Sequence, residues 1–326
     1  MSADPIKRYH RFVPEIKLGS VAVRAAKIAN DPEYGCHRLQ VARSALFHDA
    51  NRHSVLLEPD QKNTRDLTGL LSEAWEFGTS NYDDGNITQE YLLDLVAHLD
   101  GTHLMQSYCE IRRNDFRTGD VRMSGHNDVH PPGGPNVGPE MYDLIEYLNM
   151  EEFNPAIRAF NAHLHICRIH PFYDGNGRTS RMLMNIMLYK NGLPTVCIPS
   201  SEKETYRGLL RGAMRDYERR NEHEPHYEME DTLMHFQIDK MAKSLESLDE
   251  NLRTHRQHVV KTSGFEKGQL ISAKKQIASI MRRHDSGTVR MKDGIFTVHG
   301  DIGQKHLKPI FEGVCGKKGK YDISSE

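Results

Sequence analysis

Residues 170–181 read HPFYDGNGRTSR, so a histidine, an aspartate, two glycines and two arginines fall within twelve positions. The residues that follow, up to Gly192, are apolar on nearly every side of a helix, which is typical of a helix in the middle of a bundle. Before the stretch, apolar residues recur at helical spacing, as in Ile157, Phe160, Leu164 and Cys167. Strand patterns are few. We therefore expect a mainly α-helical bundle with residues 170–181 between its central helices.

The composition of the chain is that of an ordinary soluble protein. Of its 326 residues, 37% are hydrophobic and 27% are charged, and the formal net charge of -2 gives no global basic field for nucleic acid. No apolar run approaches the roughly 18 residues of a membrane-spanning helix, and the first residues lack the apolar segment of a secretory signal. Five scattered cysteines without a CxxC pair are typical of reduced thiols. We expect a cytoplasmic protein with neither a membrane nor a nucleic-acid partner.

Changes in composition and periodicity along the sequence predict several segments. They are an N-terminal helical region (1–64), a domain around the motif (65–222), outer helices (223–262) and a small basic α+β module (263–326). Within this last module, TVRMKDGIFTVHG (288–300) is typical of a hairpin around Asp293-Gly294. The module lacks a set of stacking aromatics, so we expect it to have a structural or protein-contact role rather than to bind nucleic acid.

Two stretches before the motif carry turn signals. FRTGDVRMSG (116–125) alternates around a Thr-Gly-Asp turn and predicts a β-hairpin. HPPGGPNVGP (130–139) is rich in proline and glycine, which predicts a surface loop.

The glycines of the motif indicate an anion site. Gly175, Asn176 and Gly177 come just before a strong helix, where unpaired N–H groups and the positive end of the helix dipole bind phosphate. Arg178 and Arg181 lie in the first turn of that helix, where the dipole disfavours cations. We therefore expect a negative group to compensate them.

The remaining polar residues of the motif fit nucleotide chemistry. Asp174 beside a phosphate site is a natural ligand for Mg²⁺, which prefers a carboxylate, waters and phosphate oxygens. His170 can take a proton near neutral pH. Together they favour transfer of a phosphoryl or nucleotidyl group to a hydroxyl. The plain alternative is a polar loop capped by Asp174 or Asn176, with both arginines at the surface.

HPFYDGNGRTSR resembles the signature HPFx[D/E]GNGRxxR of the Fic (Fido-domain) family, and every defining position is filled. The resemblance implies an all-helical fold and transfer of AMP from ATP to a hydroxyl of a protein. It implies that His170 deprotonates the target hydroxyl, Asp174 holds magnesium and residues 175–177 form the anion hole. Arg178 would contact the phosphates, and Arg181 the γ-phosphate.

The resemblance extends beyond the motif. Residues 116–135 are similar to the family's flap, a hairpin that holds the target segment by adding a strand to it. Phe116, Arg117 and Val121 would belong to this target-docking flap. Tyr206, on the helix after the motif, stands where family members often place an aromatic near adenine.

Many Fic proteins resemble one another in an inhibitory helix with the pattern [S/T]xxxE[G/N], whose glutamate pairs with the second motif arginine. SNYDDGN (80–86) is similar, with Ser80 at the first position and the shorter Asp84 in place of glutamate, in a helical region near 70–86. We hypothesise weak autoinhibition through Asp84 and Arg181. The alternative is that the same residues form only a turn before a helix that begins near Thr88.

Several functional hypotheses stay open on the sequence. The leading one is a protein adenylyltransferase that uses Mg²⁺ and ATP to modify a Ser, Thr or Tyr hydroxyl. The same scaffold also suits removal of AMP, or transfer of UMP or phosphocholine, because the motif fixes the phosphate site and not the donor. A third hypothesis is a nucleotide-sensing interaction protein. Family members often form homodimers, so the resemblance also implies a homodimer as one possible assembly.

Overall fold

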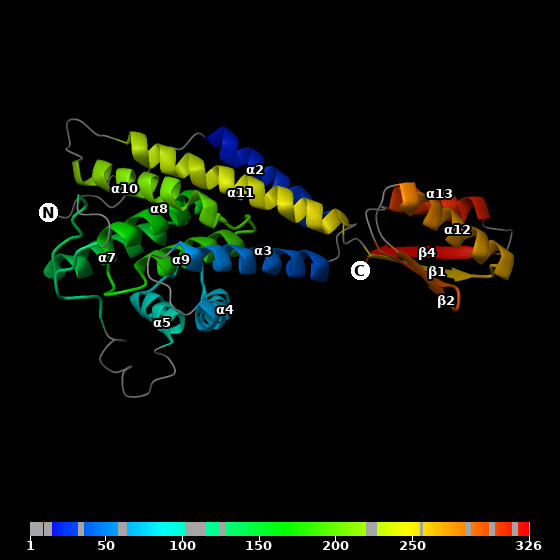
Figure 1. Cartoon of the computed structure of the whole chain (residues 1–326), viewed down its shortest axis with the longest axis horizontal. Helices are drawn as coiled ribbons and strands as arrows, with labels where there is room; N and C mark the ends of the chain where they lie inside the picture. Colours follow the sequence, from blue (N-terminus) through cyan, green and yellow to red (C-terminus); the bar gives the residue numbers. More distant parts are fainter. Residues whose placement is uncertain are drawn as a thin grey trace. The chain divides into compact units, whose positions relative to one another are not determined.

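The computed structural model describes residues 9, 15–31, 36–57, 64–101, 115–123, 128–219, 227–254, 257–283, 288–299, 304–314 and 319–325. The chain divides into two compact units, residues 1–22 with 46–244 and residues 23–45 with 245–326 (Figure 1). The helices are α2 (Glu15–Ala29), α3 (Cys36–Leu56), α4 (Thr64–Asn81), α5 (Gln89–Asp100), α7 (Gly134–Leu148), α8 (Pro155–Ile169), α9 (Asn176–Lys190), the short 3-10 helix η2 (Ser200–Glu202), α10 (Lys203–Arg219), α11 (Glu228–Thr254), α12 (Lys267–Arg283) and α13 (Gln304–Val314). In the described part of the chain, no helix has both the length and the apolarity needed to cross a membrane.

Two adjacent helices form the centre of the first unit. Every residue of α8 from Ala156 to Ile169 is buried, and α9 is buried from Arg178 to Leu188. The two helices pack side by side within the unit (Figure 1). Residues 170–175 therefore connect two buried helices, and residues 176–181, which the sequence also placed between the helices, form the start of α9.

The stretch 130–139 is helical over its second half, so its prediction as a surface loop was wrong there. Helix α7 begins at Gly134 and accommodates both Pro135 and Pro139. Proline fits the first turn because that position has no helical partner for an N–H group. A side chain at Gly134 would bring its Cβ within 1.7 Å of the Thr118 carbonyl oxygen, so only glycine allows this approach.

Residues 115–123 contain no β-strand, which contradicts the hairpin predicted there; Ser124 and Gly125 lie outside the described residues. The backbone pairs elsewhere. The Arg117 N–H donates to the Pro171 carbonyl at 2.9 Å, and Gly119 N–H donates to the Tyr173 hydroxyl at 3.3 Å. This segment therefore forms hydrogen bonds with the motif loop and does not pair as a β-strand.

The second unit contains a four-stranded antiparallel sheet. Its strands are β1 (Gln257–Ser263), β2 (Thr288–Lys292), β3 (Ile295–His299) and β4 (Lys320–Ser325), in the spatial order β2-β3-β1-β4. Together with α12 and α13 this gives the βαββαβ arrangement of ferredoxin-like folds. The predicted hairpin is confirmed: Lys292 pairs with Ile295, and Asp293 and Gly294 have φ of 51° and 78°, as a tight primed turn requires.

One face of this sheet packs on both helices (Figure 1). Phe311 of α13 is fully buried and meets Phe296 of β3 edge-to-face, with ring centroids 5.1 Å apart. Val260, Ala273 and Ile277 complete the centre of this core. A core of this kind depends strongly on its largest aromatic side chains.

We expect Phe311→Ala to destabilise this sheet by about 3–5 kcal/mol, because it removes a fully buried aromatic ring and leaves a cavity. Hydrogen exchange on the full chain should then show faster exchange of the β1, β3 and β4 amides. Ile271→Ala is the matched control, since Ile271 on α12 is 41% exposed. Unchanged exchange in Phe311→Ala would contradict the assigned core.

Candidate active site

His170 ends helix α8 in a left-handed backbone conformation, with φ 54° and ψ 55°. Its N–H donates to the Ile166 carbonyl at 2.9 Å. The ring Nδ1 lies 3.3 Å from the Cys167 carbonyl oxygen. A carbonyl only accepts, so Nδ1 carries the ring proton in this contact and Nε2 carries the lone pair. The half-buried imidazole is therefore arranged to accept a proton at Nε2.

The loop after His170 leads into an uncapped helix N-terminus. Gly175 has a left-handed φ of 80°, and no side chain caps the start of α9. Asn176 does not serve as a cap because its amide is used inside the loop: Oδ1 accepts from Phe172 N–H at 2.9 Å and Nδ2 donates to the Phe172 carbonyl at 2.7 Å. What Asn176 and Gly177 offer an anion is thus their main-chain N–H groups.

Asp174 is the carboxylate that fits a magnesium ion. Its side chain is 86% exposed, and one oxygen lies 3.4 Å from the Arg178 guanidinium. A single exposed carboxylate beside a phosphate site suits Mg²⁺, which keeps several waters and takes its other ligands from phosphate oxygens. Arg178 is only 9% exposed, so its charge stays near the start of α9.

Arg181 is buried and held by α3. Its Nε donates to the Ser54 hydroxyl at 2.8 Å, and Nη2 donates to the Ser54 carbonyl at 3.1 Å. Nη1 donates to the Tyr206 hydroxyl at 3.4 Å. The guanidinium is therefore held by oxygens of Ser54 and Tyr206, and these neutral acceptors do not balance its positive charge.

Tyr206 is a buried hydrogen-bond partner of Arg181, which contradicts its prediction as an adenine contact. The side chain is 2% exposed, and its hydroxyl lies 2.7 Å from Nε2 of His163, whose Nδ1 in turn lies 3.0 Å from the Gln237 amide. A buried hydroxyl needs hydrogen-bond partners, and the interior supplies them here. Complete burial, with the nearby Arg181 charge, lowers the pKa of His163 to about 3, so the ring stays neutral.

Comparisons with known proteins agree with this geometry. Residues 86–188 match the model of the Fic/DOC family. They form a Fic/DOC family domain. The chain is 38% identical over 218 residues to a protein adenylyltransferase Fic of Drosophila willistoni, which covers 60% of this chain and 43% of that protein. It is 39% identical over 104 residues to the protein of the same name from Drosophila mojavensis, covering 31% of this chain and 20% of that one. The chain thus spans less than half the length of these relatives.

Solved Fic structures share the fold. A Fic family protein from Desulfovibrio desulfuricans superimposes with a TM-score of 0.53 at 13% identity, covering 91% of this chain and 99% of that one. At this identity the likeness concerns the fold alone. It extends well beyond the Fic domain matched at residues 86–188.

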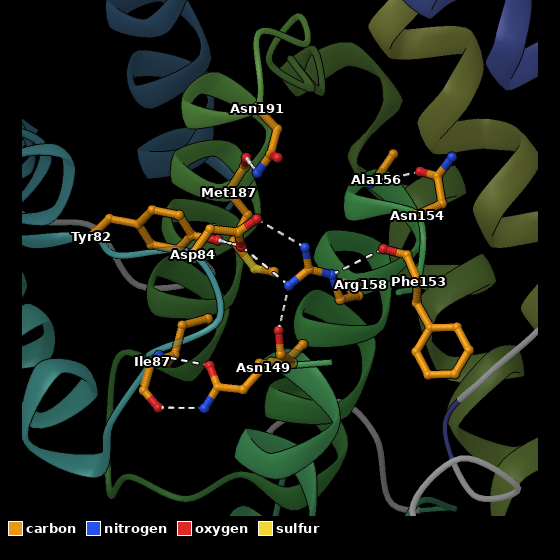
Figure 2. Close-up of polar contacts among 11 residues, drawn as sticks. Tyr82, Asp84, Ile87, Asn149, Phe153, Asn154, Ala156, Arg158, Met187 and Asn191 are labelled. Carbon is orange, nitrogen blue, oxygen red and sulfur yellow. Dashed lines mark hydrogen bonds and ion pairs between the residues drawn. The ribbon is translucent and has the colours of Figure 1, made fainter. Parts of the chain in front are cut away.

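Asp84 does not pair with Arg181, which contradicts the sequence hypothesis about an inhibitory contact. Its two carboxylate oxygens accept from Nη1 and Nη2 of Arg158 at 3.1 and 3.0 Å (Figure 2). Tyr82 donates its hydroxyl to the same carboxylate at 2.6 Å. The Arg158 side chain is 2% exposed, so its buried charge requires a carboxylate partner, and Asp84 is that partner.

The Asp84 contact belongs to a wider anchor between two parts of the Fic domain. Arg158 also donates to the Leu148 carbonyl at 2.6 Å, and Asn149 binds both main-chain groups of Ile87 at 2.7 and 2.8 Å (Figure 2). Ser80 is exposed at the end of α4. Residues 84 and 85 form a turn and α5 begins after Thr88, as the alternative predicts, but the N-cap is Thr88 itself, whose hydroxyl accepts from Tyr91 N–H at 3.1 Å, and Asp84 also binds Arg158.

The flap residues lie inside the domain or at its edge. Phe116 is buried and faces Phe172, with centroids 6.0 Å apart. Arg117 is 3% exposed, and Val121 is half-buried. The Arg117 side chain does not reach the surface, and docking of a target by the main chain of this flap stays a prediction.

Sequence reasoning missed Ser54 as a residue of the site. A signal was present: residues 54–59 read SVLLEP, which has the Ser-to-Glu spacing of the inhibitory pattern, with Pro59 in the last place. Glu58 lies outside the described residues. His163 and Gln237 carried no comparable signal, because their roles depend on long-range contacts with Tyr206 and Arg181.

We expect Asp84→Ala to destabilise the Fic domain by about 3–5 kcal/mol, since it leaves Arg158 buried without its carboxylate. Urea denaturation with a probe in the helical unit measures this. Asp83→Ala is the matched control, because Asp83 is exposed and its removal should change stability by under about 0.5 kcal/mol. Equal effects of the two substitutions would contradict the anchor.

The same pair should make stability depend on pH. Burial raises the pKa of Asp84, but the hydrogen bonds from Arg158 and Tyr82 outweigh it and hold that pKa below its usual value. A depressed pKa gives stability that is complete above the unfolded value of about 3.9 and is lost as pH falls through the folded value. The difference in the free energy of unfolding between wild type and Asp84→Ala should therefore stay constant from pH 8 to about 5 and become smaller below about pH 4.

Proposed function

We propose that this protein transfers AMP from ATP to a Ser, Thr or Tyr hydroxyl of a protein target. One observation carries the proposal: a histidine whose Nδ1 faces a main-chain carbonyl stands at one end of a short loop, and a helix N-terminus with two buried arginines stands at the other. The adenylyltransferase names of its relatives support the same activity. The dispersed cysteines support the reducing cytoplasm as its compartment.

In this proposal His170 takes the proton of the target hydroxyl at Nε2. The oxygen forms a bond to the α-phosphorus, the bond from that phosphorus to the bridging oxygen breaks, and diphosphate leaves. The N–H groups at the start of α9 and the Arg178 guanidinium would stabilise the charge on the phosphates. Asp174 would hold Mg²⁺, which supplies charge neutralisation for the leaving diphosphate. Arg181 would bind the γ-phosphate.

Removing the base should abolish transfer while leaving the nucleotide site. We expect His170→Ala to lower protein labelling from ATP labelled at the α-phosphate by at least about 10²-fold, because general-base catalysis contributes 10²–10⁴-fold. ATP affinity, measured by equilibrium dialysis, should stay within about twofold. His130→Ala, which removes an exposed histidine, is the matched control.

The other hypotheses give different results in the same experiment. Wild-type protein that binds ATP but labels nothing, in a lysate or by itself, would favour a nucleotide-sensing interaction protein. Labelling from UTP or CDP-choline in place of ATP would favour another phosphate-linked donor. Release of AMP from an already modified target would favour the reverse reaction.

We also propose that inhibition of this site comes from the end of α3 and not from Asp84. Ser54 holds Arg181 through two hydrogen bonds, and Glu58 follows it at the spacing of the inhibitory pattern. A carboxylate near Arg181 would compete with the γ-phosphate for the same guanidinium. Pro59 replaces the glycine or asparagine of the pattern.

Glu58→Ala should raise both ATP affinity and self-labelling, within the roughly 5–150-fold range of ordinary coupling energies. Equilibrium dialysis and labelling from ATP measure the two effects. Glu76→Ala is the matched control, because Glu76 follows Ser72 at the same spacing but lies exposed on α4. Equal responses of the two variants would reject Glu58 as the inhibitor.

A further inference from the structure

A single buried arginine connects the flap to the residue proposed as the base. Arg117 is 3% exposed, and its Nε donates to the carbonyl of His170 itself at 2.7 Å. Its Nη2 donates to the Ile169 carbonyl at 3.1 Å. One edge of the guanidinium therefore holds the last carbonyls of α8.

The rest of the guanidinium holds the flap side. Nη1 donates to the Gly119 carbonyl at 2.7 Å, and Nη2 also donates to the Pro132 carbonyl at 2.7 Å, just before α7. Among the described residues, all side-chain hydrogen bonds of Arg117 go to main-chain carbonyls. Two of these carbonyls, those of Ile169 and His170, lie at the end of α8. The other two, those of Gly119 and Pro132, lie in the flap segment (residues 116–135).

The position of His170 needs such support. A left-handed conformation costs a non-glycine residue free energy and persists only where surrounding contacts impose it. A cation at the carboxyl end of a helix is favoured by the helix dipole, and Arg117 supplies it at the end of α8. The planar fork of arginine can reach several carbonyls at once, whereas a lysine ammonium is a point charge on a flexible stem.

We propose that Arg117 is a positioning residue: it fixes the backbone of His170 and couples the position of the flap to that of the base. This inference rests on the proposed transfer function. A target segment bound along residues 118–121 would shift the Gly119 carbonyl, and the shared guanidinium would carry that shift to His170. Arg117 acts through these carbonyls and contacts neither nucleotide nor target.

The test compares Arg117→Lys and Arg117→Ala with wild type in steady-state labelling from ATP. A misplacement of about 1 Å can cost about 10²-fold in rate, so we expect kcat to fall by that order. KM for ATP and ATP affinity should stay within about twofold, because the carbonyls that accept hydrogen bonds from the Arg117 side chain, those of residues 119, 132, 169 and 170, all lie outside residues 174–181. Arg290→Met is the matched control, since Arg290 is an exposed arginine of β2, outside the flap and the motif, and should leave kcat unchanged.

Two further measurements separate positioning from a loss of folding. Guanidinium ion at millimolar concentration should restore part of the kcat of Arg117→Ala, whereas methylammonium should not, because it cannot bridge the carbonyls. Arg117→Lys with full kcat, or with kcat and ATP affinity reduced together, would overturn the proposal.

Hydrogen exchange distinguishes failure of this inference from failure of the proposed function. If wild type and His170→Ala are equally inactive, the transfer function fails. Exchange in Arg117→Lys then decides the inference. Faster exchange of the His170 and Arg117 amides, which donate to Ile166 and Pro171, with unchanged exchange in α5, supports the coupling. Unchanged exchange at both amides rejects it.

Discussion

The turn between α8 and α9 is the constraint on which the rest of the Fic domain depends. Both helices are buried, so residues 170–175 must end one and begin the other in a short turn, whose exposed residues are Tyr173 and Asp174. The chain manages this with left-handed backbone at His170 and at Gly175. The two helix ends are treated differently: Arg117 occupies the carbonyls at the end of α8, while no side chain caps the N–H groups at the start of α9. The protein thus supplies hydrogen-bond partners at the end of α8, and the proposed anion site lies at the start of α9.

The polar groups of these buried helices determine which distant segments must come together. Arg158 requires Asp84, and Arg168 requires Glu140, whose carboxylate accepts from it at 2.5 Å. Removing one partner of such a pair leaves a buried charge, which costs far more than an exposed pair contributes. The loop before α5 and helix α7 are therefore fixed against α8 by electrostatics as well as by apolar packing. This explains why the carboxylate of Asp84 is committed to structure and not to the nucleotide site.

Local sequence predicts what local chemistry decides. The buried α9, its stop at Gly192 and the Asp293-Gly294 hairpin follow from periodicity and turn residues, and the structure contains all three. Local patterns do not predict contacts between residues that lie far apart in the sequence. The inhibitory pattern specifies a spacing but not which arginine the carboxylate binds. It predicts an ion pair between Asp84 and Arg181, whereas Asp84 binds Arg158. Likewise, the alternation at 116–125 does not show that the backbone of Arg117 pairs with the loop at Pro171.

The groups behind Arg181 give the site a fixed charge over the physiological pH range. Gln237, His163, Tyr206 and Arg181 form a series of hydrogen bonds, and His163 is the member whose ordinary pKa lies near physiological pH. Its pKa of about 3 keeps it neutral. A protonated imidazole there would add a second positive charge beside the guanidinium and would compete for the same anion. Because the ring stays neutral, it orients the Tyr206 hydroxyl without changing the local charge. The imidazole therefore adds no charge that competes with Arg181, whose guanidinium is held by the hydroxyl and carbonyl oxygens of Ser54 at the end of α3.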